Sequence, residues 1–408
     1  MRACVRPSSS SDFAIAAPVL PSAGDAAVRP FGPGPSVEIV PIESLPQDWA
    51  AAWDDLARDA SEPSIFVERW FVLPGIRHLA PGSGTRMLAV WQGRRLIGLI
   101  PLGIDSHYGR APIRNVQNWR HHHNFLGSPL VRAGHERLFW TAILEALDQA
   151  DWAPGFLHLS AMAEGGPLLA GLRAAGRPVD VVHVRHRAML QSDLGAQAYY
   201  EATVRKKKRK EIGRLASRLA ELGAVEYGHF RRGEDLSAWC DDFLALEMSG
   251  WKGRAGSALG SAPETEAFLR EMVVGAEAEG RLDFLRLTLD GKPIAMLLNL
   301  LAPPGSFSFK IAFDEEYARF SPGVLIQLEN LKILERRGIA WMDSCAVENH
   351  SMINSLWGER RTIVRVTVPL AGLRRRLAFA LCRAAERGLG LARRLHAPKS
   401  APPARDDE

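Results

Sequence analysis

The chain has 408 residues, of which 47% are hydrophobic and 24% are charged, so it can bury two ordinary cores or one large one. Its four cysteines form neither a C-x-x-C pair nor a dense framework, which argues against zinc ribbons and disulfide scaffolds and fits a reducing cytoplasm. The longest apolar run, residues 294–302, is far shorter than the roughly 20 residues that a membrane helix needs. We therefore expect a globular, cytoplasmic protein.

The two ends of the chain differ in composition from the rest. Residues 1–36 are rich in Ser, Pro, Ala and Gly, and prolines interrupt their short apolar patch, which predicts a disordered leader rather than a signal peptide. Residues 372–396 hold seven arginines and one glutamate, a charge of +6, whereas the whole chain carries +5. The remainder therefore sums to about −1, and the surface as a whole is not basic.

The chain between these ends contains an internal repeat. The first copy reads as a Gly-turned hairpin, a helix and a strand, at residues 87–102, 136–150 and 156–160. The second copy reads as a similar hairpin, a strand, a helix and a strand, at residues 284–301, 307–313, 321–337 and 339–344. Two α/β units in tandem explain this pattern with the fewest assumptions.

Two segments carry clustered cations. Residues 205–210, Arg-Lys-Lys-Lys-Arg-Lys, open an amphipathic helix and form either a solvated helix face or a surface that steers phosphates or nucleic acid. Trp251, Lys252 and Arg254 precede a Gly-containing loop and suit an acidic or sugar-like acceptor, unless the tryptophan packs and the loop is simply solvated. His121–His123 are adjacent and have no carboxylate or cysteine at ligand spacing, so we expect no metal site there.

The turn at residues 321–324 is the most informative local feature. Ser321 suits a helix N-cap, Pro322 suits the first helical position, and Gly323 lets a ligand approach the backbone. The helix should run about four turns. Its free N–H groups favour an anion such as the diphosphate of coenzyme A. We therefore expect Ser321, Pro322, Gly323 and Val324, with Arg319 just before them, to hold that ligand; a plain helix start is the alternative.

These features together resemble a known family. The hairpin, the run from Tyr317 to Gly323 and a following strand that ends in Asp343 look like the GNAT superfamily of acyltransferases. The basic helix at 205–218 and the segment 247–254 look like its bacterial branch named after the cellulose-biosynthesis protein CelD. Downstream of Asp343 this chain lacks the Gly-rich stretch and the Tyr-Lys pair that often occur in that branch, so the resemblance does not define the acceptor.

The resemblance implies an α/β (α+β) tandem GNAT-like fold, akin to the Fem aminoacyltransferases, with two mixed sheets flanked by helices. It implies acetyl-CoA or another acyl-CoA as co-substrate and no metal. The domain boundaries that we expect are a leader at 1–36, a degenerate GNAT-like domain at 37–190, a catalytic GNAT domain at 191–370, and a basic amphipathic helix with a disordered tail at 371–408.

Acyl transfer from a thioester to an amine needs a group that takes the amine proton and a group that stabilises or protonates the leaving thiolate. Asp343, Glu348 and His350 are the candidate bases, because they lie at or just beyond the end of a strand, where open α/β sheets bind ligands. Each would otherwise be a capping or solvated group. Tyr317 is a candidate proton donor to the thiolate, or an aromatic residue that only packs.

Three functions are open at this point. The leading one is an acyl-CoA N-acyltransferase that acts on a small amine, such as an amino sugar or another polysaccharide precursor of the cell envelope. A Fem-like enzyme would instead take its acyl group from aminoacyl-tRNA and would depend on the cations of 205–218. A non-catalytic GNAT-like scaffold in exopolysaccharide assembly would need no open anion site, so the Ser-Pro-Gly turn favours catalysis.

The basic segment 372–396 places Leu373, Leu377 and Leu381 at helical spacing, with most arginines on other faces. Such a helix lies on an anionic membrane surface, or it packs its leucine stripe on the second domain and exposes its arginines. The sequence leaves both interpretations open. The first would suit an enzyme that modifies envelope precursors.

Overall fold

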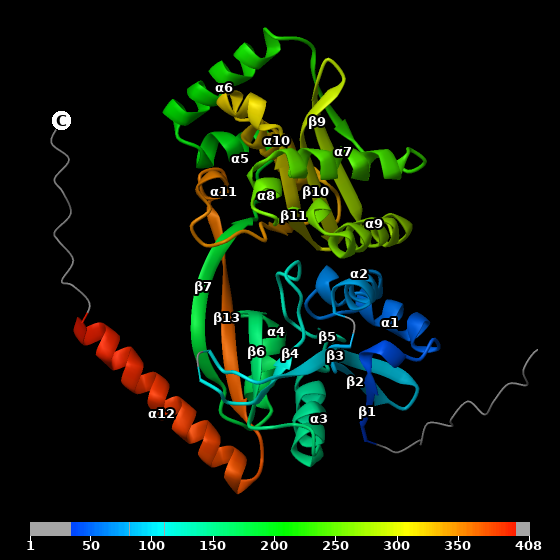
Figure 1. Ribbon diagram of the computed structural model, residues 1–408, viewed down its shortest axis with the longest axis vertical. Coiled ribbons are helices and arrows are strands. Elements are labelled where there is room, and N and C mark those ends of the chain that lie inside the picture. Colours follow the sequence, from blue (N-terminus) through cyan, green and yellow to red (C-terminus); the bar gives the residue numbers. More distant parts are fainter. Residues whose placement is uncertain (1–33, 81, 110, 397–408) are drawn as a thin grey trace, which may run out of the picture.

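The computed structural model describes residues 34–80, 82–109 and 111–396 (Figure 1). Most of the predicted leader and the part of the predicted tail beyond residue 396 lie outside these ranges. Within them, no helix combines the length and the apolar character that a transmembrane span requires.

The first half of the chain builds strands that are buried almost throughout. All residues of the segments 87–91, 96–102 and 156–163 are buried, as expected of strands that pack on both faces. The strands are β1 (Ser36–Pro41), β2 (Arg86–Gln92), β3 (Arg95–Asp105), β4 (Asn115–Asn118), β5 (Leu130–Val131), β6 (Phe156–Ala163) and β7 (Asp180–Leu190). The helices are α1 (Trp49–Arg58), α2 (Arg69–Pro74), α3 (Glu136–Gln149) and α4 (Pro167–Ala174).

The second half repeats the hairpin, helix and strand order with longer helices. Its strands are β8 (Val225–His229), β9 (Leu282–Leu289), β10 (Lys292–Ala302), β11 (Gly305–Phe313), β12 (Trp341–Asp343) and β13 (Glu359–Pro369). Its helices are α5 (Ala196–Thr203), α6 (Lys206–Ala220), α7 (Leu236–Ser249), α8 (Trp251–Arg254), α9 (Pro263–Ala278), α10 (Pro322–Asn330), α11 (Ser351–Asn354) and α12 (Leu373–His396). Both predicted hairpins and the predicted helices at 136–150 and from 205 onward are confirmed.

The strands form one continuous mixed sheet, in the order β1-β2-β3-β4-β6-β13-β7-β12-β11-β10-β9-β8, with β5 paired to β3. The mixed α/β class is as predicted. The expectation of two separate sheets is wrong, because β7 and β13 join the two halves edge to edge. Figure 1 shows both as long strands that run from one half to the other.

β7 and β13 each pair with a strand of the other half. β13 follows the second-half strands in sequence, yet it lies between the first-half strands β6 and β7, with Ile363 opposite both Ala163 and Arg185. The end of β7, at Met189 and Leu190, pairs with β12 of the second half. Because each half contributes a strand to the other, residues from both halves meet at the ends of β11 and β12. The domain boundaries at 190 and 370 stay a prediction.

The halves also share an apolar core. Phe66 of the first half lies with its ring 5.1 Å from that of Phe307 on β11, and the Phe71 ring lies 5.6 Å from Phe268 on α9. α7 and α9 cover this face of the second-half sheet, whereas α5, α6 and α10 pack on the opposite face. α3 and α4 cover the sheet in the first half. A continuous core of this kind holds the halves in one arrangement.

α12 lies against β6 of the first half and against β13, the strand that the second half contributes beside β6. Its leucine stripe faces away from the protein: Leu373, Leu377 and Leu381 are 77%, 56% and 72% exposed. The helix is attached instead through Phe379, whose ring lies 5.7 Å from that of Phe156, and through Arg375. The interpretation in which the stripe packs on the second domain is therefore wrong for these three residues.

Candidate active site

The candidate site lies where β11 and β12 part. The two strands are parallel, but they pair only over Gly305–Phe307 and Trp341–Asp343. Beyond that point a cavity of about 180 Å³ opens, with Lys252, Ser308, Lys310, Gln327, Ser344 and His350 among the residues of its wall. The carboxyl ends of strands in an open α/β sheet are a usual place for ligands. The cavity therefore occupies the position that the sheet topology favours for a site.

A bulge in β11 shapes the wall of this cavity. Leu298 of β10 is opposite Lys310, and the next residue, Asn299, is opposite Ser308, so Phe309 has no partner on β10. A bulge disrupts the ladder locally and re-aims a side chain. Here Phe309 belongs to the apolar core and borders the cavity, and Lys310 lines the cavity next to it. The bulge thus brings a lysine to the site from a largely apolar strand.

Lys310 is a poorly solvated cation. Its ammonium lies 5.6 Å from the ring centre of Phe125 and 5.9 Å from that of Phe309. Burial lowers the pKa of Lys310 to about 8, the nearby Glu247 carboxylate opposes that shift, and the Lys252 ammonium adds to it. A group that titrates near neutral pH and faces a cavity is suited to accept and return a proton.

The lowered pKa of Lys310 makes the stability of the protein depend on pH. The folded protein loses this proton at about pH 8 and the unfolded chain at about 10.5, so the unfolded chain binds more protons between these values. We therefore expect wild type to gain stability relative to Lys310→Met as pH rises from 8 to 10.5. Urea unfolding of both proteins across this range measures the difference, and a difference that does not change with pH would contradict the burial of the charge.

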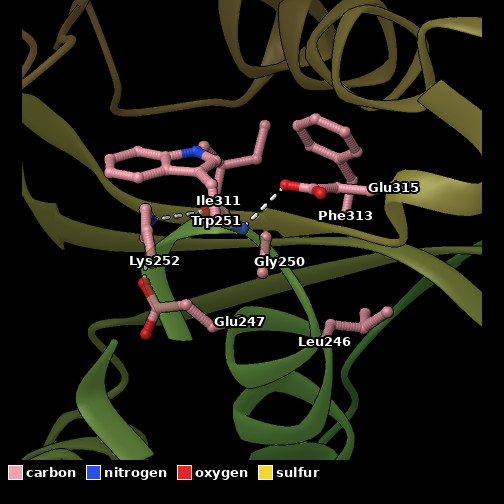
Figure 2. Close-up of a pocket in the computed structure, with 9 residues that line it drawn as sticks. Leu246, Glu247, Gly250, Trp251, Lys252, Ile311, Phe313 and Glu315 are labelled. Atoms are coloured by element: carbon pink, nitrogen blue, oxygen red, sulfur yellow. Dashed lines mark hydrogen bonds and ion pairs between the residues drawn. The ribbon is translucent and has the colours of Figure 1, made fainter. Parts of the chain in front are cut away.

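Lys252, whose charge acts on Lys310, is fixed by a buried carboxylate. Figure 2 shows Lys252 between Glu247 and Ile311. Its ammonium donates to Glu247 Oε1 at 2.8 Å and to the carbonyl oxygen of Ile311 at 3.1 Å. The Leu259 N–H donates to the other Glu247 oxygen at 2.7 Å, and Glu247 is only 3% exposed. The carboxylate therefore positions Lys252 and neutralises one of the two cations of the site.

Trp251 and Arg254 are joined to the connection between β11 and α10. The Trp251 N–H donates to Glu315 Oε1 at 2.7 Å, and Arg254 Nη2 donates to Glu315 Oε2 at 2.7 Å. The Trp251 side chain remains 58% exposed. The segment is a short helix, α8, where the sequence suggests a loop. An exposed indole on an anchored helix can cover a bound molecule at the mouth of the site.

The start of α10 matches the prediction in position and differs in detail. Pro322 is the first helical residue, but Ser321 has φ 55° and its hydroxyl makes no capping bond. The Val324 N–H donates to the Ser321 carbonyl at 2.9 Å. Among the described residues, the Gly323 N–H has no acceptor. The α-helix ends at Asn330 and continues as a 3₁₀ turn to Glu335, so the four predicted turns are of two kinds.

Asp343 lies at the strand end, as expected, and is fully buried. Arg187 Nη2 donates to its Oδ2 at 2.6 Å, Arg361 Nη1 donates to the same oxygen at 3.0 Å, and the Cys345 N–H donates to Oδ1 at 2.9 Å. Although burial opposes it, the two guanidinium groups hold the pKa of Asp343 below its usual value. A carboxylate with these contacts is a poor proton acceptor. Its ion pair with Arg187 of β7 links the two halves.

Glu348 and His350 occupy different places in the loop after Asp343. Glu348 is exposed and accepts a hydrogen bond from the His186 N–H at 3.3 Å. His350 lines the cavity and caps α11, because its Nδ1 accepts from the Ile353 N–H at 3.4 Å. With Nδ1 as an acceptor, the neutral ring carries its proton on Nε2. His350 is therefore the loop residue that can present a proton to the cavity.

Tyr317 and Arg319 lie in the 3₁₀ turn Glu315–Phe320 that precedes α10. The Lys292 ammonium lies 5.8 Å from the centre of the Tyr317 ring, and Tyr317 packs at the edge of the core beneath α10. Arg319 is exposed and stacks on Phe320 at 4.7 Å. Neither residue lines the cavity, but Arg319 stands within the turn that leads to the free Gly323 amide.

Of the three adjacent histidines, His121 and His123 pack at the junction between the halves, whereas His122 is exposed. Burial is the main reason that the pKa values of His121 and His123 both fall to about 3, so both rings are neutral. His121 stacks on Phe71, and His123 stacks on Phe268. Over the described ranges, no group of three or more His, Cys, Asp or Glu residues is placed to hold a metal ion.

A second cluster of cations lies beside the site, on the face shared by β7 and β13. Arg120 and Arg187 donate to the successive carbonyls of Asn124 and Phe125, at 3.1 and 2.8 Å. Arg185 is two residues from Arg187 on the same face of β7. Burial, followed by the charges of Arg185, Arg365 and Arg187, lowers the pKa of Arg120 to about 10. Arg120 and Arg185 have no carboxylate in an ion pair among the described residues.

A family model described as an acetyltransferase (GNAT) domain matches residues 206–350. The match covers β8 to β12 and the loop that ends at His350, and so includes every residue of the cavity wall up to α11. The second half of this chain is therefore similar to GNAT acetyltransferase domains. A comparison with curated proteins finds no match.

Solved structures support the fold. The crystal structure of FemX aligns with 81% of this chain and 96% of its own, with a TM-score of 0.54 at 11% identity. A conserved protein of unknown function from Bacteroides thetaiotaomicron aligns with 78% of this chain and 97% of its own, with a TM-score of 0.49 at 10% identity. A tandem GNAT protein from the clavulanic acid pathway aligns with 81% and 98%, with a TM-score of 0.43 at 17% identity. The likeness to FemX shows a shared fold, and the resemblance to the CelD branch stays a prediction.

Proposed function

We propose that this protein is an acyl-CoA-dependent N-acyltransferase that transfers an acyl group directly to an amine. The observation that carries the proposal is one arrangement at the opened pair of β11 and β12. A half-buried lysine with a lowered pKa, Lys310, lines the cavity on one side, and the α10 start with the free Gly323 amide lies beyond the end of β11. Direct transfer needs no covalent enzyme intermediate.

The co-substrate that fits this arrangement is acetyl-CoA or another acyl-CoA. Its diphosphate would lie at the turn formed by Ser321, Pro322, Gly323 and Val324, where the helix dipole and the Gly323 amide favour an anion. Arg319 would add a charge there. α6 packs against the same 3₁₀ turn, so its exposed lysines raise the local concentration of phosphate groups. The acyl arm would then enter the opening between β11 and β12.

The chemistry follows from the groups in the cavity. The amine nitrogen attacks the thioester carbon, and the C–S bond breaks as the new C–N bond forms. Lys310, in its neutral form, takes the proton that the amine loses and passes it to the departing thiolate, to which the Nε2–H of His350 donates a hydrogen bond. Backbone amides at the Phe309 bulge would polarise the thioester carbonyl. Asp343 and Glu348 have no place in this scheme, and Tyr317 supports the turn.

The acceptor that suits the site carries a negative charge near its amine. Trp251 would cover it at the mouth, where Lys252 lines the cavity and Arg254 lies on the same short helix, α8. The Arg120–Arg185 cluster brings further unpaired cations to the face of β7 that leads to the site. Amino sugars with phosphate or carboxylate groups, as in polysaccharide precursors, are the first acceptors to test.

A Fem-like transfer from aminoacyl-tRNA is the second candidate, because the FemX fold is shared. Part of the basic run is already engaged: Lys208 bonds to Ser355 Oγ, and Arg209 Nη1 donates to the Glu201 and Val204 carbonyls, each at 2.6 Å. These contacts give the run a structural use that needs no RNA. A non-catalytic scaffold is less well supported, since it has no use for a half-buried lysine with a lowered pKa in an open cavity.

The release of coenzyme A thiol tests the proposal. Purified protein is incubated with acetyl-CoA and pools of amines that include anionic amino sugars, and thiol release is followed with a chromogenic disulfide. We expect amine-dependent release that saturates with the acceptor. Release without an amine would indicate simple thioester hydrolysis. Transfer only from aminoacyl-tRNA would replace the proposal by the Fem-like alternative, and no transfer from either donor would favour the scaffold.

A further inference from the structure

Over the part of α12 whose side chains the structure describes, up to Glu386, the contacts with the rest of the protein come from one face. Arg375 Nη1 donates to the Asp148 carbonyl at 2.9 Å and Nη2 donates to the Ala150 carbonyl at 3.0 Å, so this side chain satisfies carbonyls at the end of α3. Phe379 contacts Phe156, and Arg383 Nε lies 2.9 Å from Asp180 Oδ2. These contacts hold the helix alongside β6 and the start of β7 (Figure 1).

The opposite face of α12 is apolar and exposed. Leu373, Leu377 and Leu381 follow one another at intervals of four residues, and each is more than half exposed. Residues at this spacing line up along one side of a helix. Contiguous exposed leucines of this kind mark a contact surface, whereas single exposed apolar residues need no explanation.

The flanks of this leucine stripe are basic. Arg374 and Arg376 are both exposed, and the helical repeat places them on either side of the stripe. A helix with a leucine face bordered by arginines lies in the plane of an anionic bilayer, with its apolar face among the lipid chains and its cations at the headgroups.

We propose that α12 docks this protein on an anionic membrane surface through Leu373, Leu377 and Leu381. The charge of the segment argues against a second copy of the chain as the occupant of the stripe. Residues 372–396 sum to +6, so two such helices face to face would bring like charges together. A membrane that contains phosphatidylglycerol supplies both the apolar layer and the opposite charge. Because the helix is fixed to α3 and β6, docking would hold the whole catalytic unit at the surface.

Vesicle co-sedimentation of the full chain tests this inference. The variant is Leu377→Glu with Leu381→Glu, which removes the stripe without touching a buried residue. Its matched control is Leu222→Glu with Val274→Glu, which adds the same charge at exposed apolar residues of the second half. Vesicles of phosphatidylglycerol mixed with phosphatidylcholine are compared with vesicles of phosphatidylcholine alone, and light scattering reports the oligomeric state.

We expect wild type and the control to bind the mixed vesicles, and the stripe variant to bind at least about tenfold more weakly. Added salt should weaken the binding. Three results would each overturn the inference: no binding by wild type, equal binding by wild type and the stripe variant, or binding to phosphatidylcholine as tight as to the mixed vesicles. A wild-type dimer that the stripe variant dissolves would show that a second copy covers α12 instead.

Discussion

Replacing Lys310 by methionine is expected to lower kcat/KM for acyl transfer by about 10²–10⁴-fold, which is the usual contribution of a positioned proton acceptor. Methionine keeps the length and apolar body of the side chain but cannot carry a proton. The measurement is thiol release with saturating acetyl-CoA across pH. Wild-type activity should rise as Lys310 deprotonates near pH 8, and the remaining activity of the variant should lack that step.

Two further variants separate proton transfer from simple charge. Lys310→Arg keeps a cation that cannot lose its proton, so it should be as impaired as the methionine variant. Lys332→Met removes an exposed lysine of the 3₁₀ turn after α10, where Lys332 is paired with Glu329, and should leave kcat/KM unchanged. Full activity in Lys310→Arg would show that Lys310 acts through its charge. Wild-type activity in Lys310→Met would remove it from the mechanism.

Replacing Asp343 by alanine is expected to destabilise the protein by about 3–5 kcal/mol, because the change leaves a buried cation without its partner. Arg187 is 1% exposed and Asp343 is fully buried, so water cannot replace the lost carboxylate. The Cys345 N–H would also lose its acceptor. Urea unfolding measures the change. Glu211→Ala, which removes an exposed ion pair with Arg214, is the control and should not shift the unfolding midpoint measurably.

The lowered pKa of Asp343 also predicts how the stability of the protein changes at low pH. The pKa of Asp343 is lower in the folded protein than its usual value of 3.8, so its contribution to stability is complete above about pH 4 and is lost as pH falls further. Asp343→Asn should lack this loss. In addition, the activity of Asp343→Asn should fall in proportion to the folded fraction. A fully folded but inactive Asp343→Asn protein would restore Asp343 as a candidate base.

The local elements could be predicted from the sequence because they depend on neighbouring residues. Gly93 turns the first hairpin with φ 59°, and Pro322 starts α10, as their residue types indicate. The pairing of β7 and β13 with strands of the other half could not be predicted in this way. β13 pairs with β6 about 200 residues earlier in the chain. Local periodicity contains no information about such a partner. The sequence therefore predicts two sheets, whereas the structure has one.

In the candidate site, too, the sequence predicts the features that depend on neighbouring residues and not those that depend on distant ones. The Ser-Pro-Gly turn could be found because three residue types share one backbone role. Lys310 was missed because a lysine in a strand usually points to solvent, and only the bulge at Phe309 turns it to the cavity. A cation that interrupts an otherwise apolar strand was the one available signal. The strand-end position of Asp343 predicts a base, because the sequence does not show that Arg187 of β7 and Arg361 of β13 pair with it.

Calorimetric titration with coenzyme A and acetyl-CoA, on wild type, Gly323→Ala and Gly323→Trp, tests the central claim most directly. A Cβ atom at residue 323 would be 3.4 Å from both Met352 Sδ and Phe313 Cδ1, an ordinary contact, so alanine should be tolerated, whereas an indole must displace these side chains and so distort the start of α10. We predict that wild type and Gly323→Ala bind both ligands and that Gly323→Trp loses at least about tenfold in affinity. Failure of wild type to bind either ligand, or equal binding by all three proteins, would contradict an acyl-CoA site at this turn.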